Sequence, residues 1–170
     1  MSEEMLFRDG LPDEDKNSGY RGASAAAAAG ISYRQLDYWA RTGLVMPTVQ
    51  DAHGSGSQRL YSFRDILVLK LVKRLLDVGV SLQQIRNAVD TLRSTGVEDL
   101  AKITLMSDGA SVYLCTSQDE VIDLLGQGQG VFGIAVGRVL REVETSLVEM
   151  GPEELTHVDE LAARRAQRTA

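Results

Sequence analysis

The sequence predicts an α+β fold, and two recurring patterns carry that prediction. Four serines each stand three residues before an acidic or amide side chain and lead into an apolar pattern of helical spacing, as at the start of an N-capped helix. They are Ser32, Ser62, Ser81 and Ser117. Glycines stand where such helices should end, so the expected helices cover residues 24–29, 33–42, 63–78, 82–95 and 118–125. Later in the chain, apolar residues alternate on both sides of an Asp-Gly pair, which indicates a β-hairpin.

The charge is unevenly distributed along the 170 residues, of which 44% are hydrophobic, enough to form a core. The formal net charge is −6, yet residues 20–95 carry 10 basic and 5 acidic side chains. Residues 1–19 carry 2 basic and 6 acidic side chains, and residues 96–170 carry 6 and 13. The acidic chain therefore contains a basic middle part, where a nucleic-acid phosphate backbone would find its counter-charges.

Several classes of protein are disfavoured. The single cysteine, Cys115, allows no internal disulfide and no cysteine-based zinc site, and only two histidines, His53 and His157, are present, so we expect no metal. No apolar run approaches the roughly 20 residues of a membrane span, and the N-terminus has no export signal, so we expect a cytoplasmic protein. The titratable residues show no spacing that would bring an acid, a base and a nucleophile together, so we expect neither catalysis nor a cofactor.

The first elements in order are a tail and two helices joined by a glycine. Residues 1–19 are acidic, interrupted by Gly and Pro, and without periodicity, so we interpret them as a disordered tail. Five alanines at 25–29 then favour a helix whose small side chains allow a close neighbour, and Gly30 makes the turn into the next helix.

The second predicted helix has two different faces. Leu36, Trp39 and Ala40 form its apolar stripe. Arg34, Tyr38 and Arg41 are spaced i, i+4 and i+7, which groups two cations and an aromatic ring on the opposite face. Such a face suits a phosphate backbone, and residues of the first turn can reach base edges; a solvated face is the alternative.

A glycine-tipped hairpin is expected next. Residues 45–49 and 59–61 look like two strands, and the segment at 52–57 between them has the permissive residues of a mobile tip. Arg59 and Tyr61 alternate with Leu60, so we expect both to leave the core face that Leu60 takes. Helix, turn, helix and hairpin together have the layout of a winged helix-turn-helix, here with four helices and a β-hairpin wing.

Residues 20–95 resemble the DNA-binding domain of MerR-family transcription regulators. The resemblance rests on ISYRQLDYWARTGLV, with its Arg, paired aromatics and closing Gly-Leu, and on SQRLYSFRDILVLKLVKRLLDVGVSLQQIRNAV, with Arg-x-Tyr and two following helices. It covers somewhat under half of the chain, and several motifs occur in the correct order. It implies a winged helix-turn-helix, a homodimer and binding to an inverted-repeat promoter site in double-stranded DNA.

The resemblance also implies roles for single residues. Ser32, Tyr33 and Arg34 would face the bases of the major groove, and Tyr38, Arg41 and Arg59 would bind phosphates. The chain departs from the family at Asp37, where an arginine is usual. A carboxylate cannot bind phosphate; it would instead orient Arg34 or Arg41, or accept a hydrogen bond from a cytosine amino group.

The third predicted helix carries a basic stripe of Lys70, Lys73 and Arg74, which either solubilises the helix or touches DNA; we favour the first. Residues 96–150 then predict a β-hairpin, a short helix, a strand at 132–136 and a helix to 150, a small α/β unit that suits a dimer interface or a small-molecule effector pocket. The glycine-rich stretch at 126–130 is interpreted as a turn rather than a phosphate cradle, and Cys115 as a buried structural thiol. Residues 151–170 are a C-terminal tail without an assigned role.

These patterns predict a sequence-specific transcription regulator. Residues 20–95 would read DNA, and residues 96–150 would dimerise and offer room for an unidentified effector. The alternative is a protein-interaction module that docks another regulator through the same scaffold. Salt distinguishes the two, because affinity for DNA would fall steeply with salt concentration, whereas affinity for a protein partner docked through apolar surface would change little.

Overall fold

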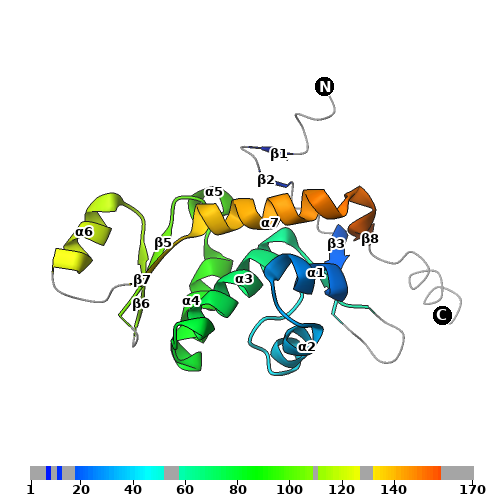
Figure 1. Ribbon diagram of the computed structural model, residues 1–170, viewed down its shortest axis with the longest axis horizontal. Coiled ribbons are helices and arrows are strands. Elements are labelled where there is room, and N and C mark those ends of the chain that lie inside the picture. The colour runs from blue at the N-terminus through cyan, green and yellow to red at the C-terminus, as the bar shows by residue number, and fades with distance from the viewer. Residues whose placement is uncertain are drawn as a thin grey trace, which may run out of the picture.

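The computed structural model describes residues 7–8, 11–12, 18–51, 58–108, 111–126 and 132–157 (Figure 1). Within these ranges the chain is a mixed α/β protein, as predicted. Helices gather around one central helix, and two three-stranded antiparallel sheets lie at opposite ends of the molecule. Near the N-terminus, β1 (Phe7–Arg8) and β2 (Leu11–Pro12) form a separate short antiparallel pair.

The helices of the N-terminal part lie within two residues of their predicted bounds. They are α1 (Gly22–Ala29), α2 (Tyr33–Arg41), α3 (Phe63–Asp77) and α4 (Leu82–Ser94). The alanines of α1 are largely buried, and their small side chains let α1 pack against α2, α3 and a later helix. Gly30 ends α1 with a φ of 74°, a left-handed conformation that glycine adopts without steric cost.

The serine caps form as predicted. Ser32 and Ser62 each build a capping box, in which the serine hydroxyl and the side chain three residues on exchange hydrogen bonds with each other's backbone N–H. The hydroxyls of Ser81 and Ser117 accept bonds of 3.4 and 3.3 Å from the backbone N–H three residues on. These bonds satisfy backbone donors that a helix start otherwise leaves without a partner.

The predicted wing is not a regular two-stranded hairpin. Strand β4 (Leu60–Tyr61) forms, but its partner is β3 (Ser18–Arg21), whose first two residues were expected to belong to the tail. Residues 45–49 form no strand, and Gln50 alone pairs with Leu60 on that side, through bonds of 3.2 and 2.8 Å. The expected tip at 52–57 lies outside the described residues.

The backbone donors of residues 45–49 explain why this strand is missing. Pro47 has no N–H to give to a ladder. The N–H of Val45 is bonded to the Trp39 carbonyl at the end of α2, and that of Thr48 to the Asp65 carboxylate at 2.8 Å. The segment is therefore tied to helix ends rather than to a strand.

The prediction that Tyr61 leaves the core is wrong. Leu60 and Tyr61 are 2% and 0% exposed, so both sides of β4 are covered. Tyr61 belongs to the main hydrophobic core, whereas Leu60 is buried outside that cluster, beside Gly19 of the neighbouring strand β3, where an added Cβ would lie 3.0 Å from the Leu60 Cβ. Strand alternation predicts exposure only where one face of the sheet meets solvent, and here neither does.

The chain returns to this sheet near its C-terminal end. Strand β8 (Leu155–His157) pairs with β3, giving the order β4-β3-β8, and follows a short 3-10 helix, η1 (Pro152–Glu154). Ser24 of α1 donates a 2.6 Å hydrogen bond to the Glu154 carboxylate. Part of the segment given no role from sequence is therefore built into the N-terminal sheet.

Residues 97–150 follow the predicted order, with one additional helix. They form α5 (Val97–Leu100), β5 (Thr104–Ser107), β6 (Val112–Cys115), α6 (Gln118–Gly126), β7 (Phe132–Ala135) and α7 (Val136–Met150). Strand β5 lies between β6 and β7, so that Leu105 faces Leu114 on one side and Ile134 on the other. The short α5 was not expected, and the stretch at 127–131 lies outside the described residues.

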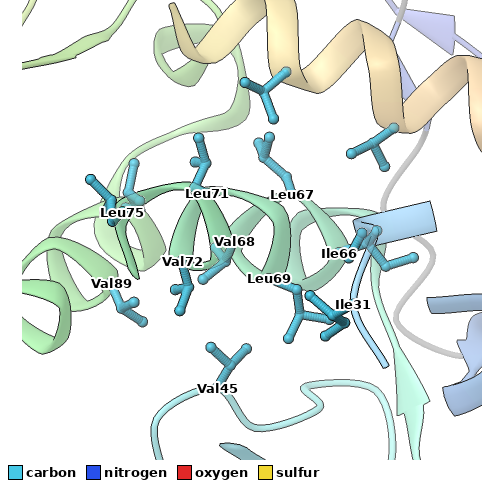
Figure 2. Packing of buried hydrophobic residues seen from close by; sticks show 14 of the residues in the cluster. Ile31, Val45, Ile66, Leu67, Val68, Leu69, Leu71, Val72, Leu75 and Val89 are labelled. Atoms are coloured by element: carbon cyan, nitrogen blue, oxygen red, sulfur yellow. The ribbon is translucent and has the colours of Figure 1, made fainter. Parts of the chain in front are cut away.

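One hydrophobic core joins both parts of the chain, with α3 at its centre. Leu67 and Leu71 point toward α7, whereas Leu69 and Val72 point the opposite way, toward the loop that carries Val45 (Figure 2). Accordingly α7 lies along α3 and α1 rather than apart from them (Figure 1). The same core thus fixes α2 on one side of α3 and the C-terminal helix on the other.

Candidate nucleic-acid interface

Helix α2 presents its first turn to solvent. The Ser32 hydroxyl accepts a 3.1 Å bond from the Gln35 N–H, so Ser32 both caps the helix and stands at its exposed start. Tyr33 and Arg34 follow in the first turn, and Tyr33 is 60% exposed. Gly22 makes room for the Tyr33 ring, because a Cβ there would lie 2.9 Å from the ring carbon Cε2. The three residues predicted to read bases therefore stand together at one end of an exposed helix.

The opposite face of α2 fixes this orientation. Leu36, Trp39 and Ala40 are buried, as the sequence predicted. Gly43 leaves the helix with a φ of 74°, and the Leu44 N–H returns to the Trp39 carbonyl at 2.9 Å. The buried face and the turn after the helix together fix how α2 is rotated about its axis, so its polar face points outward.

Asp37 joins the two predicted phosphate-binding arginines. Its Oδ2 accepts a 2.9 Å hydrogen bond from Nε of Arg41, one helical turn later, and its Oδ1 accepts a 2.7 Å bond from Nη1 of Arg59. Asp51 lies 3.7 Å from Nε of Arg59. The predicted partner of Asp37 was Arg34 or Arg41; the structure confirms Arg41 and adds Arg59, which sequence reasoning missed.

The electrostatics of this cluster follow from its hydrogen bonds. The bond from Arg59 has the largest effect in lowering the pKa of Asp37 below its ordinary value, and Arg41 adds to it. The bond to Asp37 in turn raises the pKa of Arg59. The lowered pKa keeps the Asp37 carboxylate charged at neutral pH, so its contacts with the two guanidinium groups are charge-assisted.

The two tyrosines differ in what they can contact. Tyr38 is 58% exposed on the polar face of α2, between Arg34 and Arg41 in the helical spacing. Tyr61 lies in the core, and within the described residues its buried hydroxyl has no hydrogen-bond partner. Burial raises the pKa of Tyr61 to about 12. Of these two tyrosines, Tyr38 is therefore the one whose side chain a partner can reach.

Asp65 anchors the segment that leads into the predicted wing. Its Oδ2 accepts hydrogen bonds from the backbone N–H of Ser62 and from the N–H and hydroxyl of Thr48, at 2.9, 2.8 and 2.8 Å. The carboxylate is buried and has three donors around it. The start of α3 is thereby joined to the loop that follows α2.

The basic stripe of α3 is directed at other parts of the chain. Lys70 and Arg74 lie 3.2 and 2.6 Å from the Glu142 carboxylate on α7, and Lys73 lies 2.7 Å from Asp77 one turn later. These ion pairs use the stripe for contacts within the chain, a role that the prediction of solubilising charge did not include. We leave it out of the candidate interface.

Cys115 has the features of a structural thiol. It is buried in β6, as predicted, and burial is the larger of the two effects that raise its pKa, the other being the nearby Glu120 carboxylate. Among the helices of the described ranges, none combines the length and apolar character needed to cross a membrane.

Comparison with known proteins adds a separate finding. The model of the MerR helix-turn-helix family of regulatory proteins matches residues 20–92. An uncharacterized HTH-type transcriptional regulator of Mycobacterium tuberculosis (strain ATCC 25618 / H37Rv) is 59% identical over 167 residues, which is 94% of this chain and 73% of the relative. One of Mycobacterium bovis gives the same values.

A more distant match covers less of the chain. The Heavy metal-dependent transcription regulator 1 of Rhizobium meliloti is 32% identical over 66 residues, 39% of this chain and 43% of that protein. The similarity to the mycobacterial proteins, in contrast, extends far beyond residues 20–92 and includes the C-terminal part.

Proposed function

Because this chain belongs to the MerR family of helix-turn-helix regulatory proteins, we propose that it acts in the cytoplasm as a homodimer on an inverted-repeat promoter site in double-stranded DNA. In this proposal the first turn of α2 enters the major groove, where Ser32, Tyr33 and Arg34 contact base edges. Tyr38, Arg41 and Arg59 bind the phosphates on either side.

One observation carries the proposal: the outward face of α2 is continuous with Arg59 at the base of the predicted wing. The two most exposed aromatic rings of this part of the chain, Tyr33 and Tyr38, lie on that face. Asp37 brings Arg41 and Arg59 to the same place from two elements. Aromatic hydroxyls and guanidinium groups that converge on one convex helix suit a phosphate backbone and a groove better than they suit a small ligand.

The C-terminal part supplies the proposed dimer contact and offers room for an effector. Ile122 of α6 and Val148 of α7 are 63% and 65% exposed, which is apolar surface that a second protomer would cover. In a two-fold dimer each protomer would read one half-site, so the site would be an inverted repeat.

The test is selection of retained duplexes from random-sequence DNA by the purified full-length chain. The proposal expects an enriched palindrome with two half-sites, and sedimentation of the complex as two protomers on one duplex. A monomer that binds a single half-site would overturn the dimer. No enrichment at any salt concentration would overturn sequence-specific binding and favour the protein-interaction module instead.

A further inference from the structure

Asp37 occupies both of its carboxylate oxygens with arginines from two different elements. Oδ2 accepts the bond from Arg41, in the next turn of α2, and Oδ1 accepts the bond from Arg59, beside β4. The Arg59 side chain is 19% exposed, that of Asp37 34% and that of Arg41 63%. Through one carboxylate, the last turn of α2 is thus linked to the base of the predicted wing.

This arrangement changes the charge of the surface as well as its geometry. Together with Asp51, 3.7 Å from Arg59, the four side chains carry no net charge, although two of them are arginines. Each guanidinium has five N–H donors, and Asp37 takes one from each. Nε of Arg59 is buried, so a phosphate can reach only the other remaining donors, and only from the directions that the carboxylate leaves open.

We propose that Asp37 is a specificity-determining residue, which fixes Arg41 and Arg59 in the one arrangement that fits phosphates when the first turn of α2 is in register with its site. The inference rests on the proposed function.

Asp37 is expected to have opposite effects on the affinity for random DNA and on the affinity for the cognate site. Non-specific binding follows the number of phosphates that cations neutralise, and a carboxylate between two arginines reduces it. At a cognate site, phosphate contacts set register and orientation, and preorganised side chains lose less conformational entropy on binding. Asp37 therefore weakens binding to random DNA while it supports binding in register.

The experiment compares Asp37→Asn with the native protein on two duplexes: the one enriched by selection, and a scrambled duplex of the same length and composition. Fluorescence anisotropy gives both affinities from about 50 to about 200 mM salt, a range in which affinity responds to each phosphate contact. For Asp37→Asn we expect affinity for the scrambled duplex to rise about threefold, with a steeper salt dependence, because neutralising the carboxylate favours about one more phosphate contact. We expect the preference for the selected duplex to fall about fivefold or more, since affinity there does not rise in parallel.

Two further variants separate this role from a plain change of charge. Asp77→Asn makes the same charge change at a carboxylate that also has an i, i+4 partner, Lys73 at 2.7 Å, but lies at the far end of α3. We expect it to leave the preference unchanged. Asp37→Glu keeps the charge and can reach both arginines, so it should retain most of the preference that Asp37→Asn loses. Exposed ion pairs contribute little to stability, so all three variants should unfold at temperatures close to that of the native protein.

The outcomes distinguish this inference from the proposed function. If the native protein prefers the selected duplex and Asp37→Asn prefers it equally, the inference is overturned and the proposed function stands. An equal loss of preference in Asp77→Asn would also overturn it, since Asp37 would then act only as one surface charge among others. If the native protein prefers no duplex, both fail.

Discussion

The guanidinium of Arg74 on α3 donates a 2.6 Å hydrogen bond to the carboxylate of Glu142 on α7, across 68 residues of sequence. Lys70 lies 3.2 Å from the same carboxylate. Below this ion pair the two helices share apolar contacts, with Leu67 and Leu71 of α3 directed toward α7 (Figure 2). Helix α3 is therefore packed directly against the C-terminal helix through both apolar and charged side chains.

The ion pair should contribute little to this packing. Replacement of Glu142 by Gln is expected to lower the free energy of unfolding by less than about 1 kcal/mol, because all three side chains are partly exposed and solvent screens their attraction. Urea unfolding measures the change, with Glu149→Gln on the exposed face of α7 as the matched control. A loss several times larger for Glu142→Gln would mean that charge, rather than the apolar layer, holds α7 in place.

Substitution of the candidate DNA contacts should separate base-reading from phosphate-binding residues. Arg34→Ala is expected to cost about 1–3 kcal/mol at the selected site and little on scrambled DNA. Arg41→Ala and Arg59→Ala should weaken binding to both duplexes and reduce the salt slope by about 1. Anisotropy titrations at several salt concentrations measure both quantities. Unchanged affinity and slope in all three variants would rule out this docking of α2 on DNA.

What could be read from the sequence was local. The serine caps and the glycine exits are short-range signals, and they give the helix bounds within two residues. The pair of Asp37 and Arg41 is likewise visible as an i, i+4 spacing of opposite charges. Each of these features depends only on residues within one or two turns.

What could not be read depends on residues far along the chain. Arg59 meets Asp37 from 22 residues away, and nothing local in either segment indicates it. Tyr61 was expected outside the core because it alternates with Leu60 along the strand, but Tyr61 lies in the main core and Leu60 is buried as well. Residues 45–49 have the composition of a strand, yet Asp65 and Trp39 take their backbone bonds. Tertiary partners decided each of these cases.

Two tyrosines of similar chemistry should respond differently to loss of the hydroxyl. Tyr38→Phe removes an exposed donor from the candidate interface, so we expect it to weaken DNA binding by about 1 kcal/mol, about fivefold. Tyr61→Phe should leave DNA affinity unchanged, and it should stabilise the fold by up to about 1 kcal/mol, because no described residue forms a hydrogen bond with the buried hydroxyl. Titrations and urea unfolding of both variants give the answer. Weaker DNA binding by Tyr61→Phe without loss of stability would mean that the Tyr61 hydroxyl does contact DNA.

Asp65 should matter more for stability than an ordinary helix cap. Asp65→Ala removes three accepted hydrogen bonds and leaves the backbone N–H of Thr48 partly buried without its partner, so we expect a loss of about 3 kcal/mol. Ser81→Ala, which removes only the 3.4 Å bond at the start of α4, should cost about 1 kcal/mol. Chemical unfolding of both variants compares the two losses. Equal losses would contradict the role of Asp65 in joining α3 to the loop after α2.

Gly137, near the start of α7, offers a test in which two effects predict opposite signs. Alanine has the higher helix propensity, and on that ground Gly137→Ala would stabilise the fold by up to about 1 kcal/mol. However, an added Cβ would overlap the carbonyl oxygen of Ala101, which belongs to the backbone and cannot rotate away. We therefore expect a net loss of about 1–3 kcal/mol, as in other overpacked cores.

Gly96→Ala is the control for this substitution, because the nearest atom to an added Cβ there is a carboxylate oxygen of Asp99, 3.7 Å away. Gly96 caps α5 with an ordinary φ of −61°, so alanine should cost less than about 1 kcal/mol at that position. Urea unfolding of the two variants gives the comparison. A gain in stability for Gly137→Ala would mean that α7 can move away from Ala101 without loss, and hence that the contact between α7 and the turn after α5 does not fix the position of the C-terminal helix on α3.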